Sequence, residues 1–146
     1  MKKIIFLVLI AFLAIGSYAQ KKMASIEGAW KMVFTPNYFD PNAVLEGKVP
    51  GSQIKMWSKE IFLFVGHFEM DTTKQESFGG GTYKLNGKRY EENITYHFMK
   101  PLIGQNMKML LEIRHDTLIQ RWPVDENWKL VKGYYTEQYV RLKKKC

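Results

Sequence analysis

Apolar and polar residues alternate with a period close to two over most of this chain, and turn residues interrupt the alternation at roughly ten-residue intervals. Successive side chains of a β-strand point to opposite faces, so this period gives each segment one apolar face. The pattern predicts an all-β meander of about eight to ten strands. Closing the meander into a single up-and-down antiparallel barrel removes the unpaired edges that an open sheet would leave.

Asn86-Gly87 is the clearest turn signal, because both central positions of a type I′ hairpin turn take positive φ. Counting outward from this pair places Leu85 opposite Lys88, and it places His97 on the outer face. The predicted inward face of the hairpin carries Tyr83, Leu85, Tyr90, Ile94, Tyr96 and Phe98. Glu92 falls on the same face, so either a bulge intervenes or a carboxylate points into the barrel.

The same counting predicts further strands at 28–35, 52–58, 61–68, 107–114, 117–122, 128–131 and 134–143. The segment 61–68 is continuously apolar, which is typical of a strand that is buried on both faces or passes through a barrel.

The long connection from Pro36 to Gly51 breaks the alternation. Within it, Asp40 as N-cap, Pro41 and a terminating Gly47 predict one short helix. A connection of this length is typical of a lid or a binding loop. Its aromatic residues, Tyr38 and Phe39, would either gate the barrel mouth or hold the loop down.

Residues 1–19 have the pattern of a cleaved signal peptide. Lys2 and Lys3 precede an uncharged apolar run from Ile4 to Gly16, and the small residues Ser17 and Ala19 mark a cleavage site. The run is shorter than the roughly 20 apolar residues that a spanning helix needs. We therefore expect one exported domain at 20–146, periplasmic or secreted, with no transmembrane segment in the mature chain.

Composition narrows the function classes. Cys146 is the only cysteine, so no intramolecular disulfide forms and the core must hold the exported domain together. The net charge of +8 falls to +6 when Lys2 and Lys3 are removed. The remaining basic residues form no stripe with interleaved aromatic residues. Nucleic acid is therefore an unexpected partner. No phosphate-binding glycine loop precedes a helix, and we expect no cofactor.

Several short motifs resemble the calycin superfamily, which includes the lipocalins and the fatty-acid-binding proteins. Gly28-Ala29-Trp30 begins the first strand, a long connection follows it, and Arg141 lies in the last strand. The resemblance implies that Trp30 closes one end of the barrel and that Arg141 packs across it. More narrowly, 80–83, 86–87, Tyr90 and 137–141 are similar to an exported bacterial lipocalin-like family of unknown function.

A barrel of about eight strands can hold one small ligand. We therefore expect a non-enzymatic binding protein that carries a small, mainly apolar molecule in a barrel cavity. The candidate lining residues are Phe62, Phe64, Tyr83, Glu92, Tyr96, Phe98, Met109, Leu111 and Trp122. Each of them also has a simpler interpretation as ordinary core.

Two other functions compete with this one. The first is an interaction module for an envelope protein or a glycan, with a filled barrel and with Trp57, Trp122 and Trp128 as exposed anchors. The second is a hydrolase or isomerase that uses Glu92 or a histidine in the cavity.

The sequence patterns that could indicate a metal site or a catalytic site are weak evidence for either. His67, Glu69 and Asp71 have a spacing that could approach a metal ion, although solvent-facing strand residues explain it more simply. His115-Asp116 is typical of a turn. We expect neither a metal site nor an enzyme.

Overall fold

The computed structural model describes residues 25–34, 51–70 and 73–143. The predicted signal peptide, the predicted helix with Tyr38 and Phe39, Asp71 and Cys146 all lie outside these ranges. The strands are β1 (Gly28–Phe34), β2 (Gly51–Ser58), β3 (Ile61–Met70), β4 (Thr73–Asn86), β5 (Arg89–His97), β6 (Asn106–Arg114), β7 (Thr117–Val124) and β8 (Leu130–Arg141). A short 3-10 helix, η1 (Lys100–Leu102), lies between β5 and β6.

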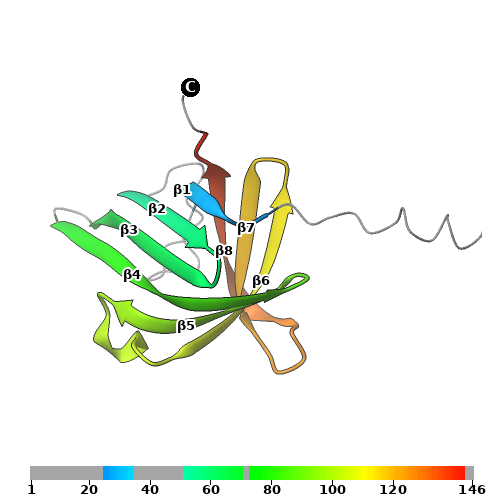
Figure 1. Cartoon of the computed structure of the whole chain (residues 1–146). Coiled ribbons are helices and arrows are strands. Elements are labelled where there is room, and N and C mark those ends of the chain that lie inside the picture. The colour runs from blue at the N-terminus through cyan, green and yellow to red at the C-terminus, as the bar shows by residue number, and fades with distance from the viewer. Residues whose placement is uncertain (1–24, 35–50, 71–72, 144–146) are drawn as a thin grey trace, which may run out of the picture.

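Each strand pairs antiparallel with the next, and β8 pairs with β1, so the sheet closes into an up-and-down barrel. The predicted fold class is confirmed, with eight strands. In Figure 1, β2 to β5 form one side of the barrel and β6 to β8 form the other. No helix in the described part of the chain has the length and apolar character needed to cross a membrane.

The β4–β5 hairpin turns at Gly87 and Lys88, one residue later than the sequence suggested. Asn86 pairs with Arg89 and Leu85 pairs with Tyr90, so the register differs by two residues from the predicted one. A shift of two keeps every side chain on the same face, whereas a shift of one would reverse them all. The predicted inward positions at this end are therefore correct, and Tyr90 is fully buried.

A bulge changes the faces farther along β5. Gly81 pairs with Ile94 but Gly80 pairs with Tyr96, so Thr95 is the extra residue. Beyond it the faces are reversed, and Tyr96 is 67% exposed on the outer surface. The predicted inward position of Tyr96 is wrong for this reason.

His97 follows the same reversal. His97 is half-buried, with its ring 5.4 Å from that of the inward-facing Phe64. Phe98 packs beside Phe78, which is 51% exposed, at 6.3 Å between ring centroids. The outward position predicted for His97 is wrong, whereas Phe98 follows the end of β5 and is half-buried.

The outer face of β2 to β5 carries apolar side chains. Ile61, Leu63 and Val65 of β3 are 54%, 47% and 58% exposed, so β3 is not buried on both faces. The strand registers place these side chains in two neighbouring rows, one of Ile54, Val65 and Phe78 and the other of Met56, Leu63, Gly80 and Tyr96. We call this surface the outer apolar face.

Candidate functional site: the barrel interior

One end of the barrel, which we call the Trp30 end, is sealed. Trp30 is fully buried, and its indole N–H donates to the Ile26 carbonyl at 2.8 Å. The Arg141 guanidinium lies 4.0 Å from the centre of the Trp30 ring and donates to the carbonyl of Glu27 at 2.7 Å and to that of Ser25. This is the arrangement that the resemblance implied for Trp30 and Arg141.

A buried ion pair crosses the middle of the barrel. The Lys55 ammonium on β2 contacts the Glu92 carboxylate on β5, and the two residues are only 4% exposed. Around Lys55 Nζ, the ring centres of Trp57, Phe62, Phe64 and Tyr90 lie at 5.2, 5.1, 5.9 and 5.9 Å. The aromatic faces and the carboxylate together replace the water that the ammonium loses on burial.

Tyr90 extends this ion pair into a hydrogen-bonded chain. Its hydroxyl donates to Glu92 Oε1 at 2.7 Å and accepts from the Trp57 indole N–H at 2.7 Å. Burial, and then the neighbouring Glu92 carboxylate, raises the pKa of Tyr90 well above its ordinary value. The phenol therefore remains a proton donor at neutral pH.

A second polar chain also crosses the interior. Ser77 of β4 donates to Gln53 Oε1 at 3.0 Å, and Gln53 Nε2 donates to the Tyr139 hydroxyl at 3.4 Å. The Tyr139 hydroxyl in turn donates to Glu137 Oε2 at 2.6 Å. The chain links β4, β2 and β8, so side chains rather than open space occupy the lumen at this level.

Gln120 is a buried interior residue whose side-chain oxygen lacks a hydrogen-bond donor among the described residues. It is 2% exposed, and its Nε2 lies 2.7 Å from Met109 Sδ. No hydrogen-bond donor in the described residues reaches its Oε1. A buried acceptor without a partner costs about 1–3 kcal/mol.

We therefore expect Gln120→Met to raise the free energy of unfolding by about 1 kcal/mol, because it removes the unpaired acceptor at nearly constant volume. Urea denaturation measures the change. Gln53→Met is the matched control, and it should destabilise the protein because Gln53 links Ser77 to Tyr139. Equal effects of the two substitutions would contradict this description.

The opposite end, which we call the Trp122 end, has a different lining. Inward-facing side chains there are half-buried and come from four strands, namely Phe68 of β3, His97 of β5, Met107 of β6 and Trp122 of β7. Phe68, Met107 and Trp122 pack on the buried core. The inner surface at this end is therefore mainly apolar. The Gln53 chain lies deeper, between this surface and the middle of the barrel.

The structure separates the predicted lining residues into three groups. Phe62, Tyr83, Met109 and Leu111 are buried core, and Glu92 is buried in its ion pair. Phe64 and Trp122 are half-buried on the inner side, Tyr96 is on the outer face, and Phe98 is half-buried between the rings of His97 and Phe78. The predicted anchor Trp57 is 2% exposed, so the predicted set of three exposed tryptophans is wrong.

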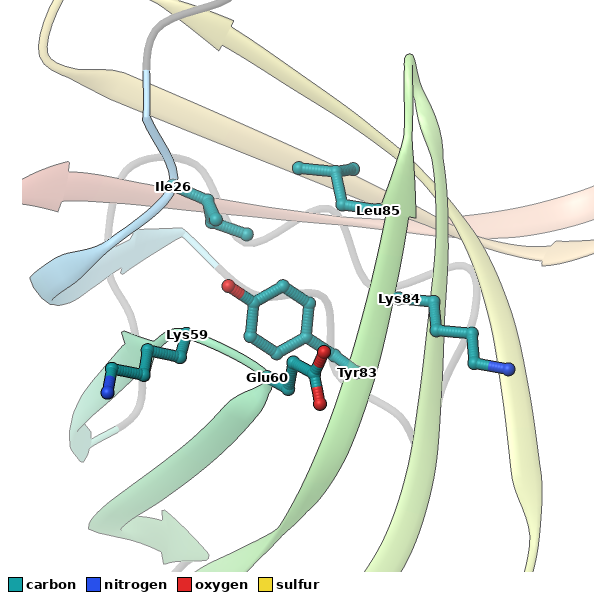
Figure 2. A pocket seen from close by; sticks show the side chains of 6 residues that line it. All are labelled: Ile26, Lys59, Glu60, Tyr83, Lys84 and Leu85. Carbon is teal, nitrogen blue, oxygen red and sulfur yellow. The ribbon is translucent and has the colours of Figure 1, made fainter.

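A shallow pocket of about 360 Å³ lies at the Trp30 end, and Ile26, Lys59, Glu60, Tyr83, Lys84 and Leu85 line it. Figure 2 shows the Tyr83 ring in its middle, while the Lys84 ammonium points away. Burial, and then the Glu27 and Glu60 carboxylates, raise the pKa of Tyr83. None of these lining residues belongs to the polar chains of the interior.

The remaining candidate motifs are His67-Glu69-Asp71, of which the structure describes His67 and Glu69, and His115-Asp116. His67 Nε2 lies 4.0 Å from Glu69 Oε1, and no group of three potential metal ligands occurs among the described residues. His115, with φ of 56°, occupies the β6–β7 turn as predicted. The Asp116 carboxylate forms an ion pair with the Lys143 ammonium, with 2.8 Å between Oδ2 and Nζ.

Sequence reasoning missed the polar interior, although one signal pointed to it. Lys55 is two residues before Trp57 and so shares its face, which means that a buried Trp57 implies a buried Lys55. Comparison with protein-family models and with curated proteins found no match to this chain.

Proposed function

We propose that the chain is exported and is a non-enzymatic binding protein that takes a small, mainly apolar molecule inside the Trp122 end of the barrel. The observation that carries the proposal is the difference between the two ends. The Trp30 end is closed by Arg141, whereas the Trp122 end presents half-buried Phe68, His97, Met107 and Trp122 on its inner side. Apolar walls with a few polar groups are typical of small-molecule sites.

The interior limits the size and position of the ligand. The Lys55–Glu92 pair and the Gln53 chain occupy the middle of the barrel. The proposed site therefore lies between them and the Trp122 end. A ligand there would place its apolar part against Phe68, Met107 and Trp122. A polar group on the ligand would face His97 or the Gln53 chain.

The pairing of the interior charges supports binding rather than catalysis. A general acid or base must reach the substrate with its own proton or lone pair. The Lys55 ammonium is instead held by Glu92, and Glu92 also accepts from Tyr90. Breaking this pair to perform chemistry would leave an uncompensated charge in the core.

Native mass spectrometry of the full-length chain, expressed in an exporting bacterial host, tests both parts of the proposal. We expect the denatured mass to lack residues 1–19 and the native mass to include a bound small molecule. Met107→Lys, which places a charge in the proposed site, should lose the added mass, whereas Val65→Lys on the outer apolar face should keep it. An unprocessed denatured mass would refute export, and a native mass of the bare chain in every preparation would refute ligand binding.

The outer apolar face favours a second candidate, an interaction module whose partner is another protein. Its rows are formed by Ile, Val, Leu, Met, Phe and Tyr side chains and contain few hydrogen-bonding groups. A glycan would require more polar groups, so a protein surface fits this face better. An added mass of protein size that Val65→Lys loses and Met107→Lys keeps would favour this candidate.

A further inference from the structure

The His97 side chain is hydrogen-bonded to the backbone of the turn that follows it. The backbone N–H of Met99 donates to His97 Nδ1 at 3.0 Å. Because a nitrogen can accept this bond only when it carries no proton, the contact requires an imidazole that is unprotonated at Nδ1. The start of the turn at 98–105 therefore depends on the protonation state of one side chain.

Backbone hydrogen bonds hold both ends of this turn. The Phe98 N–H donates to the Phe78 carbonyl at 2.9 Å, and the Gly104 N–H donates to the Ile94 carbonyl at 2.8 Å. Between them, Leu102 packs against the core. Met99 itself is 45% exposed, and its N–H donates to the imidazole.

The surroundings of His97 favour the neutral ring. The Phe98 ring stacks on it with 4.7 Å between ring centroids, and the Phe64 ring lies at 63° to it with 5.4 Å between centroids. Burial lowers the pKa of His97, the Met99 backbone and then the Glu92 carboxylate act to raise it, and the Lys55 ammonium acts to lower it, with a lowered pKa as the result. The packed strands β3 and β4 bring the uncharged Phe64 and Gly79 to this ring, and Lys100 is the charged residue of the turn itself.

We propose that His97 and Met99 form an acid-sensitive clasp at the Trp122 end, in which protonation of His97 releases the start of the 98–105 turn at Met99. Protonation turns Nδ1 from an acceptor into a donor, so it opposes the Met99 N–H. It also creates a partly desolvated cation near the Lys55 ammonium, which draws the ring toward water. The clasp stands without any ligand; acid-driven ligand release through it rests on the proposed function.

The direction of the pH dependence follows from the lowered pKa. Unfolded His97 has the ordinary pKa of about 6.5, so below this pH the unfolded chain binds the proton more readily than the folded chain. The clasp therefore contributes fully to stability above the ordinary pKa. Its contribution is lost as the pH falls from there toward the lowered value.

Amide hydrogen exchange of the unliganded protein, followed by NMR, tests the clasp. We expect the protection factor of the Met99 amide to fall about tenfold between about pH 7.5 and about pH 5, the worth of one hydrogen bond. His97→Asn keeps an acceptor near the Nδ1 position without titrating, so its Met99 amide should stay protected at both pH values. His97→Phe removes the acceptor and should leave this amide unprotected at both.

His115→Asn, at an exposed turn position, is the matched control and should behave as the wild type. Constant Met99 protection while His97 itself titrates would overturn the clasp, as would an unchanged acid response in His97→Asn. A working clasp in a protein that never carries a ligand would leave the clasp intact and refute only the binding proposal.

Discussion

Replacing Lys55 by Met should lower the free energy of unfolding by about 3–5 kcal/mol, because it leaves the Glu92 carboxylate buried without its cation. Methionine preserves most of the lysine stem, so the contacts with Trp57 and Phe62 are largely retained. The loss therefore reports the uncompensated charge rather than a cavity. Equilibrium denaturation in urea measures it.

The double substitution Lys55→Met with Glu92→Gln separates charge from packing. Glutamine can still accept the hydrogen bond from Tyr90, and the buried charge is gone. We expect the double variant to regain most of the stability, since an ion pair of this kind is often replaceable by neutral groups of similar volume. If the losses of the two single variants simply added, the ion pair would not be the connection between them.

Trp30→Ala should cost about 3–5 kcal/mol, because it empties a fully buried position at the sealed end of the barrel. Its ring packs edge-to-face with that of Trp57, with 6.5 Å between ring centroids, and the Arg141 guanidinium stacks on it. Thermal unfolding followed by circular dichroism measures the loss.

Arg141→Met is the comparison for the Trp30 end. It removes the hydrogen bonds to the Ser25 and Glu27 carbonyls but leaves apolar contact with the indole, so the expected loss is smaller, about 1–2 kcal/mol. A larger effect of Arg141→Met than of Trp30→Ala would mean that the guanidinium, and not the indole, seals this end.

The strand pattern was predictable because alternation is a local property of the sequence. The inward positions of Tyr83 and Tyr90 were correct even though the turn is at Gly87 and Lys88, because a two-residue shift preserves the faces. The positions beyond Thr95 were wrong, since a bulge depends on how β4 and β5 fit together. Continuous apolarity in β3 was also misleading, because half of these side chains form the outer apolar face.

The interior polar chains could not be derived from local pattern. Gln53, Ser77 and Tyr139 meet only because three strands far apart in sequence face one lumen. Glu92 was recognised as an unusual inward residue, but its partner Lys55 is 37 positions away. Closure of the barrel brings these two charges together, and no spacing rule within a strand predicts that pairing.

Three methionine methyl groups report directly on where a small molecule binds. Met107 lies half-buried at the Trp122 end, Met109 is buried beside Gln120, and Met56 is 43% exposed on the outer apolar face. Selective ¹³C labelling of methionine methyl groups makes each position visible by NMR. Anilinonaphthalene sulfonate, which combines apolar rings with one anionic group, is a suitable probe.

Titration of the labelled protein with this probe tests the proposed site most directly. We expect the Met107 methyl resonance to move and saturate, with a smaller change at Met109 and none at Met56. Saturating changes at Met56 with Met107 and Met109 unmoved would contradict the proposed site and place binding on the outer apolar face.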